Sequence, residues 1–300
     1  MKILVTGSSG FIGRNLIDVL ESRGDAVTRL IRSKNGAKPG SAYWNPECSD
    51  MELETLEDYD AVVHLAGESI AGRWTKEKKE KIEDSRVKGT KLIAGSLAKL
   101  DNKPGVLIAA SAIGIYGDRG DEILNESSSS GSGFLADVAL RWEEALEPAA
   151  KAGIRVVKLR IGMVLGKDGG ALGKMLLPFK IGMGGVIGSG NQYWSWISIY
   201  DLIGIILYAI QNKKLNGPIN AITPKPVTNR EFTKTLGRVL GRPTIFPLPA
   251  FVARGIMGEM ARETMLASTR VVPEKLTAAG YTFSYPELEN ALTHILGANE

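Results

Sequence analysis

The sequence is poor in the residues that build disulfide frameworks and metal centres. It has one cysteine, Cys48, and two histidines, His64 and His294, among 300 residues. A single cysteine excludes a disulfide within the chain, and so few sulfur and imidazole groups predict no metal site and no serine–histidine–carboxylate triad. The lone thiol suits a reducing compartment without demonstrating one.

Long apolar runs are also lacking. The apolar stretch at residues 3–5 is too short for the core of a signal peptide. The longest apolar stretch, near residues 203–210, falls well below the roughly 20 residues that a helix needs to cross a bilayer. We therefore expect a cytoplasmic protein without a membrane anchor.

Neither positive nor negative charge is concentrated in one part of the chain. The net charge is +4 and the charged residues are scattered, which predicts no nucleic-acid interface and fits an anionic small molecule better. With 44% hydrophobic and 23% charged residues, the composition is that of an ordinary globular protein. The length is sufficient for a large core or two lobes.

The first half of the chain alternates short apolar runs with longer helical patterns, which is typical of a parallel sheet with crossover helices. The runs predict strands buried on both faces, at residues 2–5, 26–31, 61–65, 106–110 and 155–160. Between them the pattern predicts helices at residues 10–23, 75–99 and 134–152.

The second half is rich in glycine loops after Gly166 and then returns to the sheet. It predicts a helix at residues 198–211, a last strand at 218–222, and helices at 228–240 and 257–267. The fold we predict is α/β, a Rossmann-type doubly wound parallel sheet with a smaller C-terminal substrate lobe. The dinucleotide-binding part covers residues 1–165 and is completed by about 198–222, and the lobe covers 166–197 and 223–300.

A glycine-rich turn directly follows the first predicted strand and opens the first predicted helix. Its GxxGxxG spacing gives a tight turn, a bare backbone that a pyrophosphate can approach, and close packing of helix on strand. The start of the helix offers unpaired N–H groups and the positive end of its dipole to the anion. We therefore predict that a dinucleotide binds here, on Gly7, Ser9, Gly10, Phe11, Ile12 and Gly13.

The end of the second strand indicates which dinucleotide binds. NAD sites usually place a carboxylate there for the ribose 2′-hydroxyl, whereas a 2′-phosphate needs cations. This strand is followed by Arg32, Ser33 and Lys34, and Asp25 lies before it, at the wrong end. Arg32 can bind a phosphate through two N–H groups, and Lys34 adds a point charge. The sequence predicts NADP, the alternative being that these cations only face solvent.

Several further segments, covering nearly the whole chain, resemble the extended short-chain dehydrogenase/reductases. The broader family motifs HLAG, NVxGT, SSxxVYG and LRxxNVYG have counterparts at residues 64–67, 86–90, 111–117 and 159–166, with Arg86 in place of the asparagine. Finer matches indicate the atypical, epimerase-like subgroup of the NAD-dependent epimerase/dehydratase superfamily, at residues 67–70, 73–75, 133–136, 194–197 and 270–276.

This resemblance implies further contacts with the cofactor. The segment Leu65, Ala66, Gly67 and Glu68 matches the part of the family fold that passes under the cofactor, and Arg160 lies in the LRxxNVYG match. We therefore add these residues to the predicted cofactor site.

The resemblance also shows what is missing. Active members of the superfamily use a YxxxK pair as proton donor and its supporting cation, but Phe134 and Val138 stand at those positions. Ser111 matches the family serine and is a candidate catalytic residue, or it only satisfies backbone groups. Glu68 is the second candidate, either as a buried acid or base with a raised pKa or as a ligand of ribose hydroxyls. For Tyr116 we expect packing.

Two interpretations of the function follow. The first is an NADP-dependent epimerase-like oxidoreductase of a small molecule, with a nucleotide sugar as the candidate substrate. The second is a non-catalytic NADP-binding regulator or sensor linked to cell division, as the resemblance to plant proteins of chloroplast division permits. Trp194 and Trp196 either stack on the substrate or pack between lobes. A homodimer is a third, weaker possibility that the pattern does not test.

Overall fold

Eight strands form one sheet whose order reverses at its first strand. The computed structural model describes residues 1–33 and 40–297. The sheet order is β12 (Gly217–Ala221), β8 (Arg155–Ile161), β6 (Val106–Ala112), β5 (Ala61–His64), β1 (Lys2–Thr6), β2 (Ala26–Ile31), β3 (Ser41–Asn45) and β4 (Asp50–Met51). Every neighbouring pair in this order is parallel except β3 and β4. The chain therefore builds outward from β1 in both directions, as a doubly wound sheet does.

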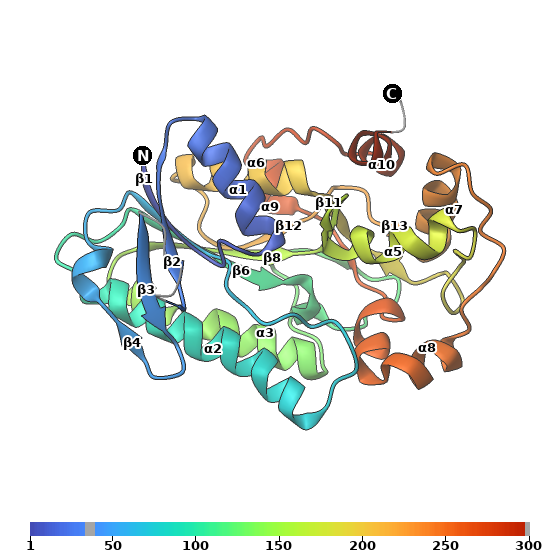
Figure 1. Cartoon of the computed structure of the whole chain (residues 1–300), viewed down its shortest axis with the longest axis horizontal. Coiled ribbons are helices and arrows are strands. Elements are labelled where there is room, and N and C mark those ends of the chain that lie inside the picture. Colours follow the sequence, from blue (N-terminus) through green and yellow to red (C-terminus); the bar gives the residue numbers. More distant parts are fainter. Residues whose placement is uncertain (34–39, 298–300) are drawn as a thin grey trace.

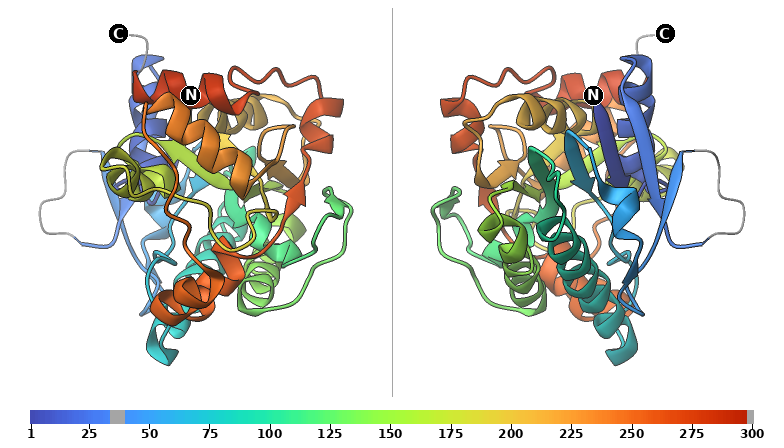
Figure 2. Two further views of the ribbon diagram at one scale, coloured as in Figure 1. Left: turned by 90° about the vertical axis from the view of Figure 1, so that its right-hand side faces the viewer. Right: turned by 90° about the vertical axis from the view of Figure 1, so that its left-hand side faces the viewer.

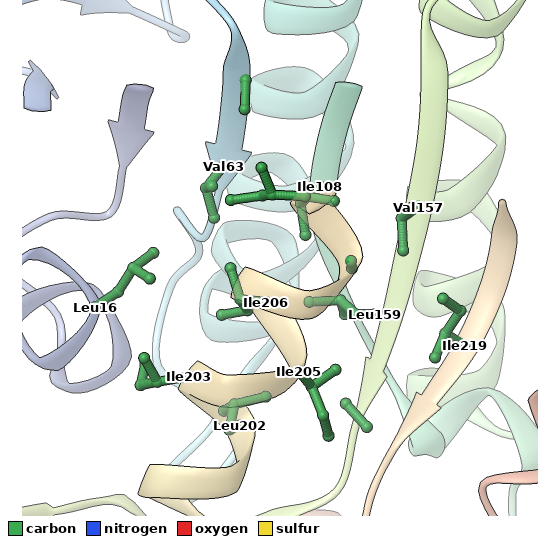
Figure 3. Packing of buried hydrophobic residues seen from close by; sticks show 14 of the residues in the cluster. Leu16, Val63, Ile108, Val157, Leu159, Leu202, Ile203, Ile205, Ile206 and Ile219 are labelled. Atoms are coloured by element: carbon green, nitrogen blue, oxygen red, sulfur yellow. The ribbon is translucent and has the colours of Figure 1, made fainter. Parts of the chain in front are cut away.

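Helices cover both faces of this sheet (Figure 1). One face carries α1 (Phe11–Ser22) and α6 (Ile199–Gln211), and the other carries α2 (Lys76–Ala98), α3 (Phe134–Glu144) and α4 (Glu147–Lys151). Figure 3 shows how α6 inserts Leu202, Ile203, Ile205 and Ile206 against strand residues such as Val63. Alternate residues of each strand point to opposite faces, so the near-continuous apolar strands supply both cores at once.

The remaining elements lie beyond the sheet and over one end of it (Figure 2). A third apolar cluster is built from the buried side chains of the later segments, including Phe232, Trp194 and Leu292. Its strands are β9 (Met163–Gly166), β10 (Tyr193–Trp194), β11 (Trp196–Ser198) and β13 (Val227–Thr228), and its helices are α5 (Gly170–Lys180), α7 (Asn229–Val239) and α10 (Leu288–Leu296).

The described residues also form several short strands, helices and turns. They are the strands β7 (Ile123–Leu124) and β14 (Arg270–Val271), the helices α8 (Ala250–Met257) and α9 (Glu274–Ala278), the 3₁₀ turns η1 (Leu53–Leu56) and η2 (Ile113–Tyr116), and the π-helical turn η3 (Ala261–Met265). Among the helices of the described residues, none has both the length and the apolar character that a membrane span requires.

The predicted strands and the first two predicted helices are confirmed within a few residues of their ends, but four features differ. The sequence pattern missed β3, whose burial alternates around Trp44. The burial predicted for β2 was wrong, because only Leu30 is fully covered on this strand near the sheet edge.

Two predicted helices are divided. The helix predicted at 134–152 is split into α3 and α4, and Pro148 lies in the first turn of α4, where a missing N–H is tolerated. The helix predicted at 257–267 is confirmed over residues 259–265, which are helical and end in the π-helical turn η3, but it begins two residues late because α8 ends at Met257. Gly258 has a φ of +64°, a left-handed conformation that stops the helix.

Candidate functional site

The carboxyl ends of the parallel strands meet at one edge of the sheet, and the predicted site residues lie along it. Gly7 follows β1, Arg32 follows β2, Glu68 lies in the segment after β5, and Ser111 and Arg160 are near the ends of β6 and β8. The strand order reverses between β5 and β1. Ligands of open α/β sheets bind in the crevice at such a reversal.

The glycine loop after β1 is packed so closely that side chains are excluded. Gly7 has a φ of +67°, and a Cβ atom on it would lie 2.7 Å from the carbonyl carbon of Leu65. A Cβ atom on Gly13 would lie 2.2 Å from the carbonyl oxygen of Gly7. The loop therefore holds its bare backbone against both the segment after β5 and the start of α1.

Within residues 1–33 and 40–297, no side chain accepts a hydrogen bond from the first N–H groups of α1. Gly10 is the N-cap, no side chain caps the helix, and the first turn has no acidic residue. By contrast, the threonine or serine side chains of Thr75, Ser198 and Thr228 cap α2, α6 and α7. Open donors and a bare backbone at the positive end of a helix dipole fit a pyrophosphate.

The hydroxyl groups of Thr6 and Ser85 hold the backbone of the segment after β5 in place. Thr6 Oγ1 accepts hydrogen bonds from the backbone N–H groups of Leu65 (3.1 Å) and Ala66 (3.2 Å). Ser85 Oγ accepts from the N–H of Glu68 at 2.9 Å. These bonds fix the four predicted residues beside the glycine loop.

His64 is a buried structural residue. Its Nδ1 lies 2.8 Å from Thr6 Oγ1 and its Nε2 lies 3.0 Å from Thr90 Oγ1. Complete burial lowers its pKa to about 4, so it is neutral near pH 7. No group of metal-ligating residues occurs in the described residues, and His294 stacks on Tyr285.

Glu68 is an exposed, paired carboxylate and not the buried acid considered above. Lys78 Nζ donates to Glu68 Oε1 at 2.6 Å, and the Glu68 side chain retains 39% of its exposure. This hydrogen bond is the main reason that the pKa of Glu68 is lowered, with further attraction from Arg32. Of the two alternatives for Glu68, the buried acid with a raised pKa is therefore wrong. The same attraction shows that the structure brings Glu68 and Arg32 near each other.

The end of β2 carries a cation and no carboxylate among its described residues. Arg32 and Ser33 are exposed at this end, and Lys34 lies outside the described residues. Asp25, at the other end of β2, accepts from the N-terminal ammonium group at 2.8 Å. The arrangement lacks the acid that NAD sites use and leaves Arg32 accessible to an anion.

Ser111 and Arg160 belong to a buried network centred on Glu143 of α3. Ser111 Oγ donates to Glu143 Oε1 at 2.8 Å, and Arg160 donates to both oxygens of that carboxylate, at 2.8 and 3.1 Å. Arg160 Nη1 also donates to the Tyr116 hydroxyl at 2.9 Å. Ser111 is 3% exposed and Arg160 8%. Both predicted site residues thus use polar groups inside the protein, and Tyr116 has the packing role expected.

The position of the family's tyrosine is filled by an aromatic contact. Phe134 begins α3, and its ring lies edge-on to Trp74 at 5.2 Å, with Lys79 Nζ 4.5 Å from the ring centre. The carboxylate of Glu263, from η3, accepts the N–H groups of Phe134 (3.0 Å) and Leu135 (2.8 Å). Neither side chain at the dyad positions can move a proton, because Val138 is also apolar and buried.

Sequence reasoning missed three groups of this site. Lys78 and Glu143 lie on helices whose charges look like ordinary solvent-facing residues in the sequence, and Glu263 comes from a distant segment with no recognisable motif. The spacing of Glu68 and Lys78 could not reveal their pairing, because they lie on a loop and a helix.

The aromatic segment after the glycine-rich stretch packs into the core. Trp194 is 7% exposed and lies 5.3 Å from Phe232, and Trp196 is fully buried. The packing alternative therefore describes both tryptophans.

A pocket of about 410 Å³ lies beside the glycine loop, between α1, the segment after β9, the start of α6 and the end of α10. Its lining includes Phe11, Arg14, Lys167 and Tyr200. The lining includes neither the segment after β5 nor Ser111, so this hollow is distinct from the crevice at the reversal of strand order.

Comparison with known proteins gives matches over nearly the whole chain. Residues 3–221 match the NAD dependent epimerase/dehydratase family, and residues 248–295 match a domain of unknown function, DUF1731. The epimerase family protein YfhF of Bacillus subtilis is 37% identical over 300 residues, which cover 99% of this chain and 98% of that protein.

Two solved structures agree with this. The crystal structure of human epimerase family protein SDR39U1 (isoform 2) with NADPH has a TM-score of 0.91 and 36% identity, covering 99% of both chains. That of the nucleoside-diphosphate sugar epimerase from Corynebacterium glutamicum has a TM-score of 0.82 and 38% identity, covering 99% of this chain and 58% of that one. Fold, loop geometry and sequence agreement together show that the chain belongs to the NAD dependent epimerase/dehydratase family.

Proposed function

We propose that the protein binds NADP(H) at the carboxyl edge of its sheet and uses it to oxidise or reduce a small molecule. The observation that carries the proposal is the uncapped start of α1 behind a glycine loop, next to a second strand that is followed by Arg32. The related human protein was crystallised with NADPH, and it shares 36% of its sequence with this chain.

Different residues would bind different parts of the cofactor. Gly7, Gly10 and Gly13 leave room for the pyrophosphate, and the N–H groups of Phe11 and Ile12 face it from the first turn of the helix. Arg32, with Ser33 and Lys34, would hold the 2′-phosphate through charge-assisted hydrogen bonds. Leu65, Ala66 and Gly67 would support the ribose side, and Glu68 can accept from ribose hydroxyls because its lowered pKa keeps it ionised.

Bound NADP(H) would supply hydride exchange with a carbon of the substrate. We propose a nucleotide sugar as the substrate class, because the related Corynebacterium glutamicum protein is described as a nucleoside-diphosphate sugar epimerase. The chain's own proton-moving candidates are Ser111 and Glu68. Ser111 would have to exchange its bond to Glu143 for one to the substrate.

A second candidate function is a regulator or sensor that binds NADP(H) without turnover. Specific observations favour it: Phe134 and Val138 replace the dyad, Ser111 donates to Glu143, and Glu68 is paired with Lys78. Each of these makes proton transfer to a substrate harder.

Calorimetry with NADPH and NADH tests the cofactor proposal. We expect Arg32→Ala with Lys34→Ala to weaken NADPH binding by about 2–4 kcal/mol and NADH binding very little, because only NADPH has the 2′-phosphate. Lys213→Ala with Lys214→Ala removes the same charge from an exposed turn after α6 and is the matched control. Equal losses for both coenzymes would refute the assignment of the 2′-phosphate site.

Absorbance at 340 nm separates the enzyme from the sensor. Purified protein with NADPH is given a panel of nucleotide sugars and simple carbonyl compounds. Turnover that is lost in Ser111→Ala or Glu68→Gln supports the enzyme, whereas tight NADPH binding without turnover across the panel supports the sensor.

A further inference from the structure

Arg86 of α2 is a half-buried cation with unused hydrogen-bond donors. Its Nη1 donates to the backbone carbonyls of Glu68 (2.9 Å) and Ile82 (3.0 Å). Its Nε and Nη2 groups make no hydrogen bond to any protein atom of the described residues. Across residues 1–33 and 40–297, no carboxylate forms an ion pair with it either. Neither group belongs to the fully buried side-chain atoms that lack a partner, so water reaches both of them. They are therefore charged donors at the surface of the crevice wall that a ligand oxygen can bind in place of water.

The guanidinium group lies against Gly67, where the missing side chain leaves room for it. A Cβ atom on Gly67 would lie 3.5 Å from Arg86 Cζ and 3.6 Å from Nη2. Gly67 belongs to the segment proposed to support the ribose. The unused Nη2 group is thus on the side of the guanidinium that meets this segment.

The same group lies beside the helix face that carries the dyad position. Arg86 Cζ is 5.0 Å from the ring centre of Trp142. Trp142 is four residues after Val138 on α3, so the two side chains share a helix face. Val138 stands where the family has its lysine. The Arg86 guanidinium, which comes from α2, therefore lies near the region that a lysine at position 138 would reach from α3.

Burial lowers the pKa of Arg86 to about 10, and attraction from Glu68 opposes that shift. The group remains charged at neutral pH. The other charges facing it do not neutralise it, because Glu68 is itself paired with Lys78 at 2.6 Å.

We propose that Arg86 replaces the missing lysine, and that its free N–H groups hold the hydroxyls of the ribose next to the nicotinamide. The inference rests on the proposed binding of NADP(H). The chain departs from the family pattern twice, with arginine for asparagine on α2 and valine for lysine on α3. The inference explains both departures together, because the cation that α3 loses is supplied by the neighbouring helix α2. Arg86 is then a cofactor-binding residue of the nicotinamide half, as Arg32 is of the adenosine half.

The test compares NADPH with 2′,5′-ADP, which has the 2′-phosphate but lacks the nicotinamide ribose. In Arg86→Gln we expect the Kd for NADPH to rise about tenfold or more, since hydrogen bonds from a charged donor are lost. The Kd for 2′,5′-ADP should stay within about twofold of wild type, because the pyrophosphate loop and Arg32 are untouched. Lys88→Gln removes an exposed cation of the same helix, paired with Asp84, and should change neither Kd.

A rescue variant keeps the test independent of general damage to the fold. Arg86→Asn with Val138→Lys restores both family residues and should bind NADPH more tightly than Arg86→Asn alone. The inference is overturned if Arg86→Gln weakens both ligands equally, or if the double variant shows no recovery. If the wild-type protein binds neither ligand, the proposed binding of NADP(H) itself is wrong. Binding of 2′,5′-ADP by the wild-type protein shows that the adenosine half of the site is present, so a failure in Arg86→Gln then concerns Arg86 alone.

Discussion

Gly13→Ala is the sharpest perturbation of the cofactor loop. In most helices this change is favourable, because alanine has the higher helix propensity by about 1 kcal/mol. Here the added Cβ atom would lie 2.2 Å from the Gly7 carbonyl oxygen and 2.9 Å from the carbonyl carbon, both backbone atoms. Separations below 3.0 Å essentially never occur, so the backbone must move.

The loop has little room for that movement. Gly7 is held in a left-handed conformation, and a Cβ atom added to it would lie 2.7 Å from the Leu65 carbonyl carbon and 2.8 Å from the Ala66 nitrogen. Overpacking of this kind costs about 1–3 kcal/mol. We expect Gly13→Ala to lower the free energy of unfolding by about 0–2 kcal/mol after the gain in propensity of about 1 kcal/mol is subtracted. NADPH affinity should fall, because the loop that receives the pyrophosphate is displaced.

Urea unfolding and NADPH calorimetry measure both effects, with Gly95→Ala as the matched control. Gly95 lies in α2 and a Cβ atom there meets nothing within 4 Å. That variant should be stabilised by about 0.5–1 kcal/mol and bind NADPH normally. If Gly13→Ala were as stable as Gly95→Ala and bound NADPH with unchanged affinity, the account of the loop would be wrong.

Two further predictions concern buried polar groups. The folded pKa of His64, about 4, lies below the 6.5 of an unperturbed imidazole, so the unfolded state takes up a proton first as the pH falls. Stability should therefore be lost between about pH 6.5 and pH 4, by up to about 3 kcal/mol, and urea unfolding of His64→Asn should lack this dependence. Glu143→Gln leaves Arg160 buried without its counter-ion and should lower the free energy of unfolding by about 3–5 kcal/mol. A loss below 1 kcal/mol in the same urea assay would show that the pair is not tightly coupled to folding.

The strands and the cofactor loop could be predicted because their signals are local. Apolar runs, the glycine spacing and the absence of a carboxylate after β2 are all visible in short stretches of sequence. β3 was missed because its five residues alternate in burial and hold only two buried side chains, Ala42 and Trp44. Such a short strand is defined by its neighbours β2 and β4 more than by its own pattern.

The environment of the site could not be read from the sequence, because it depends on partners far apart in the chain. The sequence left Glu68 open between a buried acid and a ligand of ribose hydroxyls, and its partner Lys78 lies ten residues away on another element. Ser111 matches a family serine, yet its hydroxyl is bonded to Glu143, 32 residues later. Hydrogen bonds of this kind set protonation and accessibility, and a motif carries no information about them.

The contact of Glu263 with the start of α3 has a consequence for how this architecture can vary. A carboxylate from the segment that matches DUF1731 satisfies two amides of a helix that belongs to the epimerase segment. The late segment is therefore a structural part of the crevice wall and not a detachable appendage. A chimera that exchanged it for an unrelated tail would leave those amides without an acceptor and change the shape of the crevice, even with every glycine of the cofactor loop intact.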